Sequence, residues 1–223
     1  MNPVAIITGA SRGLGWALAV DLVRDGWAVV ADARRGPFPD GVHAVPGDIT
    51  DADHRAALID TATAVGGIDL LVNNASTLGP SPLPRLADLP IDSIGDVFRT
   101  NAGAPLALLQ LALPHLRERA GAIVNITSDA AVEAYEGWGM YGASKAALDQ
   151  LSRVLGAEEP DIRVWAFDPG DMRTQMHQDA FPGEDISDRP EPETVVPALR
   201  RLLNERPPSG RIRAADLLAS VTP

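Results

Sequence analysis

Two scarce reactive side chains stand four residues apart in this 223-residue sequence. Tyr141 is one of two tyrosines, and Lys145 is the single lysine among 19 basic residues. On a helix this spacing places both on one face, so that the ammonium lies beneath the phenol. A neighbouring positive charge favours the phenolate and lowers the pKa of the tyrosine. The pair predicts an acid/base group working near neutral pH, and the alternative is a half-buried tyrosine beside a solvated lysine.

A glycine-rich turn near the N-terminus is the second chemical feature. The segment 8–15 reads TGASRGLG and connects an apolar run to a helical pattern. Glycines permit a tight turn and close backbone approach, and the N–H groups of a helix N-terminus attract phosphate. We therefore expect a phosphate-binding turn, against the alternative of an ordinary glycine turn.

Short apolar runs alternate with longer segments of helical period, which is typical of a parallel sheet with helices on both faces. Its ligands are expected at the carboxyl ends of the strands. We predict a single-domain, Rossmann-like, doubly wound α/β fold over residues 1–223. The expected strands are 4–8, 28–33, 43–45, 70–73, 122–126, 163–167 and, more weakly patterned, 211–213.

Three helices follow from the spacing of apolar residues. One spans 13–25, and another begins near Tyr141 and stops before Pro160. A long helix over 92–119 contains Pro105 and Pro114, where we expect it to bend or break. The polar stretch 171–192 shows neither helical nor strand period, and we interpret it as a lid over the ligand site.

Composition excludes several classes of function. The net charge of −11 disfavours nucleic acid and anionic membranes as partners. There is no cysteine, and the four histidines lack the spacing of paired ligands, so we predict no metal site. No basic region precedes the apolar run at 4–7 and no spanning segment follows, so we expect a cytoplasmic protein.

These motifs, in this order, resemble the short-chain dehydrogenase/reductase superfamily over nearly the whole chain. The glycine turn matches T-G-x-x-x-[A/G]-x-G, and Tyr141 to Lys145 match Y-x-x-x-K. Residues 73–76, NNAS, resemble N-N-A-G with a serine in place of the last glycine. The remaining matches are the pair Asp48-Ile49, a helical Asn101, Ser128 after the fifth strand, and Pro169-Gly170 followed by Thr174.

The resemblance implies an oxidoreductase that transfers hydride between a nicotinamide cofactor and a carbonyl or alcohol. It makes Tyr141 the acid/base, Ser128 the partner of the substrate oxygen, Lys145 the group that tunes Tyr141 and binds the ribose, and Asn101 a relay. It also implies a set of cofactor-binding residues. These are Gly9, Ser11, Arg12, Gly13, Leu14, Gly15, Arg34, Asp48, Ile49, Asn74, Ala75, Tyr141, Lys145, Pro169, Gly170, Met172 and Thr174.

The end of the second strand decides between the two nicotinamide cofactors. The family's acidic position falls on Ala33, and Arg34 follows it. Together with Arg12, Arg34 offers charge-assisted bonds to a 2′-phosphate, so we predict a preference for NADP(H). A one-residue slip of the strand would aim Asp32 at the ribose and favour NAD(H) instead.

The substrate is not specified beyond a small carbonyl or secondary alcohol. Trp138, Met140, Met172, Met176 and Phe181 either wall an apolar pocket or belong to the core. The acidic residues at 129, 133, 136 and 171 form either an acidic rim or solvated loops. An NAD(H)-dependent alcohol dehydrogenase and a non-catalytic redox sensor remain alternatives. We expect a homodimer or homotetramer, with a dimer through the helices at 92–119 and 141–155.

Overall fold

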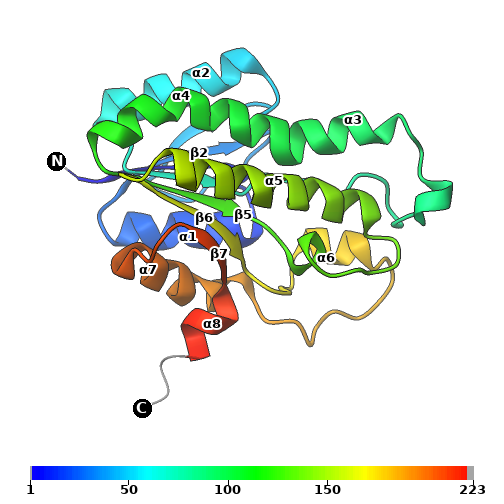
Figure 1. Ribbon diagram of the computed structural model, residues 1–223. Helices are drawn as coiled ribbons and strands as arrows, with labels where there is room; N and C mark the ends of the chain where they lie inside the picture. The colour runs from blue at the N-terminus through cyan, green and yellow to red at the C-terminus, as the bar shows by residue number, and fades with distance from the viewer. Residues whose placement is uncertain (1, 220–223) are drawn as a thin grey trace.

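The chain folds into one α/β domain around a seven-stranded parallel sheet with helices on both faces (Figure 1). The computed structural model describes residues 2–219. The strand order is β3-β2-β1-β4-β5-β6-β7, so the order reverses between β1 and β4. This confirms the predicted fold class and all the predicted strands. The strands are β1 (Val4–Ile7), β2 (Ala28–Ala33), β3 (His43–Pro46), β4 (Leu70–Asn73), β5 (Ala122–Ile126), β6 (Arg163–Asp168) and β7 (Gly210–Arg213).

Helices cover both faces of the sheet, which explains why its central strands are apolar on both sides. Leu18 and Leu199 lie in a cluster on one face, and Leu58, Leu108 and Leu155 lie in a cluster on the other. The longer helices are α1 (Gly13–Arg24), α2 (Ala52–Val65), α4 (Ala104–Glu118), α5 (Gly139–Glu158) and α7 (Val196–Glu205). The shorter ones are α3 (Ser93–Phe98), α6 (Gln175–Ala180) and α8 (Ala214–Ala219).

The long helix predicted over 92–119 changes its helical hydrogen bonding just before Pro105 and continues past Pro114. Helix α3 passes into a π-helical turn, η2 (Arg99–Gly103), and then into α4. Pro105 lies in the first turn of α4, and because it has no N–H it cannot bond to the carbonyl four residues earlier, inside η2. The expected irregularity is therefore found next to Pro105, whereas α4 continues without a break past Pro114 to Glu118. The π-turn contains Asn101, and turns of this kind are frequent at functional sites.

Several elements lie outside the predicted helices. The apolar positions of α2 form only a weak stripe, with Leu58 and Ala62 buried. Segment 171–192 holds α6, which begins at the capping residue Thr174, whose hydroxyl accepts the N–H of His177 at 3.2 Å. Six residues are too few to show a helical period. Within residues 2–219, no helix combines the length and the apolar character that a membrane crossing demands.

The packing of α2 gives a stability prediction. Leu58 is fully buried against the sheet, whereas Asp60 on the same helix is exposed. We expect Leu58→Ala to lower the free energy of unfolding by about 2–5 kcal/mol, because it leaves a cavity. Asp60→Ala, the matched control, should change it by about 0.5 kcal/mol or less. Denaturant unfolding followed by circular dichroism measures both, and equal effects would contradict this packing.

Candidate active site

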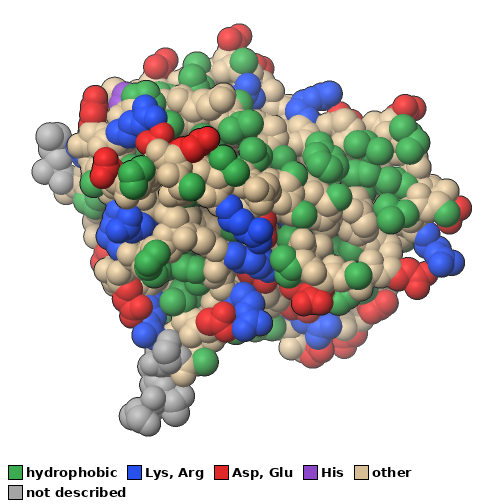
Figure 2. Space-filling view, in the orientation of Figure 1, with side chains coloured by type: hydrophobic (Ala, Val, Ile, Leu, Met, Phe, Trp, Pro, Cys, Tyr) green, Lys and Arg blue, Asp and Glu red, His purple; other side chains and the backbone are tan. Residues whose placement is uncertain are grey.

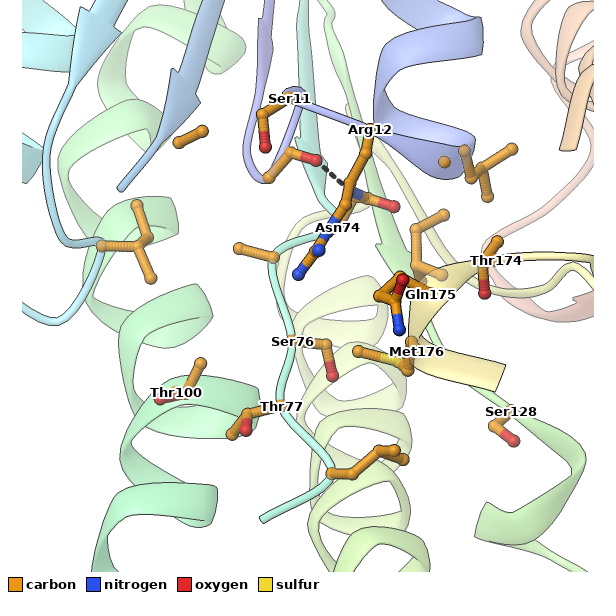
Figure 3. A pocket seen from close by; sticks show the side chains of 18 of the residues that line it. Ser11, Arg12, Asn74, Ser76, Thr77, Thr100, Ser128, Thr174, Gln175 and Met176 are labelled. Carbon is orange, nitrogen blue, oxygen red and sulfur yellow. Dashed lines mark hydrogen bonds between the residues drawn. The ribbon is translucent and has the colours of Figure 1, made fainter. Parts of the chain in front are cut away.

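A cleft of about 1280 Å³ opens at the carboxyl ends of the strands (Figure 3). It lies where parallel sheets of this type bind ligands. Of the catalytic and cofactor-binding residues expected from the sequence, Gly15 and Asn101 do not line it. The others do: Gly9, Ser11, Arg12, Gly13, Leu14, Arg34, Asp48, Ile49, Asn74, Ala75, Ser128, Tyr141, Lys145, Pro169, Gly170, Met172 and Thr174.

The glycine turn has the geometry expected of a phosphate-binding turn. Gly9 and Gly13 have positive φ angles of 68° and 58°, which glycine adopts most readily. Gly15 serves packing, because a Cβ there would lie 2.6 Å from the side-chain nitrogen of Asn74. Arg12 is the N-cap residue of α1, and its side chain makes no hydrogen bond to the N–H groups of the first turn. That turn also contains no acidic residue. The start of α1 therefore suits an anion, since its first N–H groups lack partners inside the helix.

Asn74 holds the glycine turn against the end of β4. Its side-chain amide donates to the carbonyl oxygens of Thr8 at 2.8 Å and Gly9 at 3.1 Å. The hydroxyl of Thr8 in turn accepts the backbone N–H groups of Asn74 and Ala75 at 2.9 and 3.0 Å. In Figure 3, Asn74 is labelled below the glycine turn that carries Ser11 and Arg12. Asn74 thus fixes the floor of the cleft where the strand order reverses.

The carboxylate of Asp32 is held by protein partners. It accepts the backbone N–H of Gly9 at 2.9 Å, and its second oxygen lies 2.7 Å from Nε2 of His54. Asp32 is only 2% exposed, and burial raises its pKa despite these bonds. His54, on α2, was not identified from the sequence, because a contact across 22 residues leaves no local signal. Arg12 and Arg34 are both exposed on the same cleft.

Lys145 is buried beneath Tyr141, one helical turn along α5. Its ammonium donates to the carbonyl of Ile126 at 2.8 Å and lies 5.6 Å from the centre of the Tyr141 ring. Burial lowers the pKa of Lys145 to about 8, although the charge of Asp149 opposes this shift. The predicted sharing of one helix face is thus present in the structure.

The pKa of Tyr141 is raised, whereas the sequence analysis expected a lowered value. Burial is the largest cause, and the charges of Asp168 and Asp129 add to it. Hydrogen bonding with Ser76 and Ser128 lowers the pKa but does not outweigh burial. Tyr141 is therefore a neutral phenol at pH 7, suited to donate a proton. The expectation considered the ammonium together with a bound oxidised nicotinamide and omitted the cost of placing a phenolate away from water.

Ser128 faces the cleft at the end of β5 and is oriented by the residue after it. Its hydroxyl donates to the carboxylate of Asp129 at 3.0 Å and accepts the N–H of Ala130 at 3.2 Å. The second carboxylate oxygen of Asp129 accepts the hydroxyl of Tyr135 at 3.0 Å, and this bond raises the pKa of Tyr135. Tyr135 is 47% exposed and does not line the cleft.

Asn101 is fully buried behind the cleft. Its side-chain oxygen accepts from the N–H of Thr77 at 2.9 Å and the hydroxyl of Ser76 at 3.1 Å. Its amide donates to the Thr77 carbonyl at 2.8 Å and the Ser144 hydroxyl at 2.9 Å. Asn101 thus connects the π-turn to the segment after β4 and to α5. Ser76, the departure from N-N-A-G, contacts both Asn101 and Tyr141.

The other end of the cleft combines apolar and acidic side chains. Trp138, Met172 and Met176 line it, whereas Met140 and Phe181 do not. Phe181 instead packs on Trp138, with ring centres 6.0 Å apart. Of the four acidic residues considered, those at 129 and 171 line the cleft, and those at 133 and 136 do not. His177 also lines it and was not identified from the sequence.

Comparison with known proteins agrees with this geometry. Residues 3–185 match the family model described as short chain dehydrogenase. Serine 3-dehydrogenase from Rhizobium radiobacter is 34% identical over 188 residues, covering 79% of this chain and 74% of that protein. Uncharacterized oxidoreductase C30D10.05c from Schizosaccharomyces pombe is 33% identical over 181 residues, covering 78% of this chain and 72% of the relative.

Solved structures show the same likeness. The short-chain dehydrogenase/reductase YIR035C from Saccharomyces cerevisiae superposes with a TM-score of 0.87 at 25% identity, covering 100% of both chains. An alcohol dehydrogenase from the archaeon Thermococcus sibiricus, complexed with 5-hydroxy-NADP, gives a TM-score of 0.81 at 26% identity, covering 96% of both chains. The chain belongs to the short-chain dehydrogenase family and is an oxidoreductase that acts on CH–OH or C=O groups with a nicotinamide cofactor.

Proposed function

We propose that this chain is an NADP(H)-dependent oxidoreductase for a small carbonyl or secondary alcohol. The observation that carries the cofactor preference is the state of Asp32, whose carboxylate is occupied by Gly9 and His54. Arg12 and Arg34 remain exposed on the cleft, where guanidinium groups form charge-assisted bonds to phosphate. The relative complexed with 5-hydroxy-NADP supports the same preference.

The residues of the cleft fit a dinucleotide in two places. The glycine turn and the uncapped start of α1 suit the pyrophosphate, and Asp48-Ile49 suit the adenine. Hydrogen bonds from Thr50 and the charge of Arg34 lower the pKa of Asp48, so its carboxylate is ionised at pH 7. When bound, the cofactor supplies or accepts the hydride at its nicotinamide ring.

Proton transfer to the substrate oxygen is assigned to Tyr141. In carbonyl reduction, its neutral phenol donates the proton while the Ser128 hydroxyl turns from Asp129 to hold the oxygen. Lys145 keeps a positive charge below the phenol and stabilises the phenolate that remains. Asn101 acts behind the site, by holding the segment that carries Ser76 and by bonding to α5.

Two further features of the proposal concern the lid and the assembly. Segment 171–192 contributes Met172, Thr174, Met176 and His177 to the cleft, which supports its role as a lid. A homodimer through α4 and α5 agrees with the exposure of Leu111 and Val154 on the two helices.

Cofactor titration tests the proposed preference. Followed by nicotinamide fluorescence, NADPH should bind more tightly than NADH and lose affinity as salt is raised. Arg34→Gln should weaken NADPH by about 10- to 100-fold, the value of one charged hydrogen bond, and leave NADH nearly unchanged. Arg24→Gln, an exposed arginine outside the cleft, is the control. A preference for NADH would contradict the proposal.

The two tyrosines allow a matched test of the proton donor. Tyr141→Phe should reduce turnover by about 100-fold or more, the usual value of a general acid, while NADPH affinity is retained. Tyr135→Phe removes the same hydroxyl outside the cleft and should have a far smaller effect. The measurement is NADPH oxidation with a panel of a diketone, an aryl ketone and a β-keto ester. Equal losses in the two variants would show that the donor is misassigned.

A further inference from the structure

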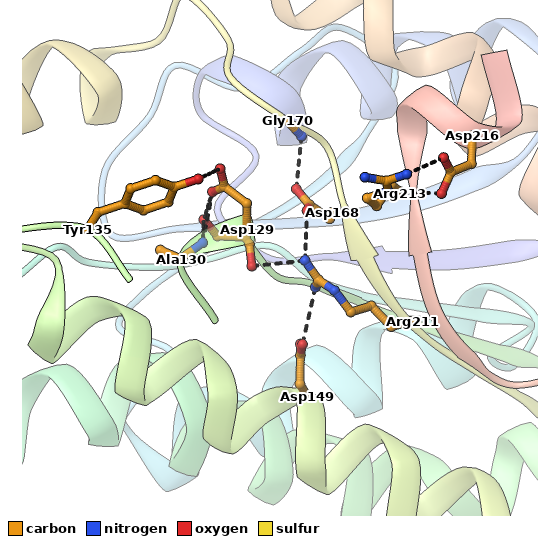
Figure 4. A network of polar contacts seen from close by, with 10 residues as sticks. Asp129, Ala130, Tyr135, Asp149, Asp168, Gly170, Arg211, Arg213 and Asp216 are labelled. Atoms are coloured by element: carbon orange, nitrogen blue, oxygen red, sulfur yellow. Dashed lines mark hydrogen bonds and ion pairs between the residues drawn. The ribbon is translucent and has the colours of Figure 1, made fainter. Parts of the chain in front are cut away.

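Arg211 on β7 joins three segments that carry the proposed active site (Figure 4). One guanidinium nitrogen lies 3.1 Å from the carboxylate of Asp149 on α5. The other lies 2.7 Å from the carboxylate of Asp168 at the end of β6 and donates to the backbone carbonyl of Ser128 at 3.2 Å. Each contact uses a donor of the planar fork, which a single ammonium cannot reproduce.

The two carboxylates share the guanidinium of Arg211. The side chains of Asp149, Asp168 and Arg211 are only 4%, 5% and 16% exposed. One oxygen of Asp149 is buried without a hydrogen-bond partner, so its bond to Arg211 is the one that compensates its burial. A buried carboxylate that loses its cation is strongly destabilised, so the guanidinium of Arg211 must stay within bonding distance of both carboxylates.

Each residue that Arg211 contacts either takes part in the proposed mechanism or lies next to a residue that does. Asp149 lies one helical turn after Lys145 on α5. The second oxygen of Asp168 accepts the N–H of Gly170 at 3.0 Å and fixes the turn after β6. The bonded carbonyl belongs to Ser128 itself. The acid/base pair, the oxygen-binding serine and the turn after β6 are thus tied to one side chain.

We propose that Arg211 is a positioning residue that holds Ser128, the Pro169-Gly170 turn and the Lys145 segment of α5 in the geometry needed for hydride and proton transfer. This inference rests on the proposed function of the same site. It assigns to β7, the last strand of the sheet, a role that the catalytic motifs do not contain.

Arg211 is also linked to Lys145 through the carboxylate of Asp149. The carboxylates whose charges act on Tyr141 and Lys145 are Asp149 on α5, Asp129 from η3 (Asp129–Ala131) and Asp168 from β6. Arg211 from β7 is paired with two of them, Asp149 and Asp168. On the π-turn side, Arg99 pairs with Asp96 at 3.0 Å on the surface. Removing the guanidinium removes a positive charge and exposes Lys145 to the full charge of Asp149, and both changes favour the ammonium.

The test uses the single lysine of the chain. In cofactor-free protein labelled with ¹³C-lysine, one Cε signal reports the titration of Lys145. Arg211→Met should raise the pKa of Lys145 by about one unit above its starting value. Arg213→Met is the control, because Arg213 lies on the same strand and pairs with Asp216 at the surface. An unchanged or lowered pKa in folded Arg211→Met overturns the proposal.

Kinetics with the best substrate of the carbonyl panel give a second readout. Arg211→Met should lower kcat by about 100-fold through misplacement of reacting groups, with a small change in NADPH affinity. Arg211→Lys restores the charge without the fork and should recover only part of the loss. Wild-type kcat in folded Arg211→Met overturns the positioning role. Absence of turnover in the unmodified enzyme counts against the proposed function, and the lysine titration still decides the role of Arg211.

Asp149→Asn covers the case in which Arg211→Met does not fold. This substitution removes the ion pair of Arg211 with Asp149 and leaves the ion pair of Arg211 with Asp168 in place. The pKa of Lys145 should then fall below about 8, because the charge of Asp149 supports the ammonium. An unchanged titration would show that Asp149 does not act on Lys145, and would overturn the link from Arg211 through Asp149 to Lys145.

Discussion

The buried ammonium of Lys145 is the constraint around which this active site is built. A charge removed from water is tolerated only with compensating partners, and here these are the carbonyl of Ile126 and the charge of Asp149. The carbonyl lies at the end of β5, so α5 must cross the sheet at that point. Gly142 makes the approach possible, because a Cβ there would lie 2.4 Å from the carbonyl oxygen of Ala130. The same approach brings Tyr141 beside Ser128.

Burial also determines the direction in which the pKa of each catalytic group is shifted. It raises the pKa of Tyr141 and lowers that of Lys145, so the two pKa values, ordinarily close together, move apart. The proposed cofactor end of the cleft is organised differently, with exposed arginines on a chain of net charge −11. Arg12 and Arg34 thus create a local field opposite in sign to that of the whole protein.

Local sequence patterns predict most of the architecture, because each strand is a short apolar run that can be recognised without its neighbours in the sheet. All strands of the sheet, the first helix and the helix bearing Tyr141 follow from apolar spacing. Helix α2 was missed because its buried stripe is narrow, and the π-turn was missed because it depends on the contacts of Asn101. Within the site, motifs identify many of the residues that line the cleft. They do not identify His54 and Arg211, whose carboxylate partners are distant in sequence and are brought near by folding.

The central claim is that the site requires a compact, buried ammonium, and Lys145→Arg tests it most directly. The chain uses arginine at every other basic position, so charge alone does not explain this lysine. A guanidinium is larger, needs acceptors for five N–H groups and does not lose its proton when buried. The measurement is turnover of NADPH with the carbonyl panel, alongside denaturant unfolding to establish that the variant folds. We expect Lys145→Arg to fold and its turnover to be reduced by about 100-fold or more. Turnover close to that of the unmodified enzyme would contradict the central claim.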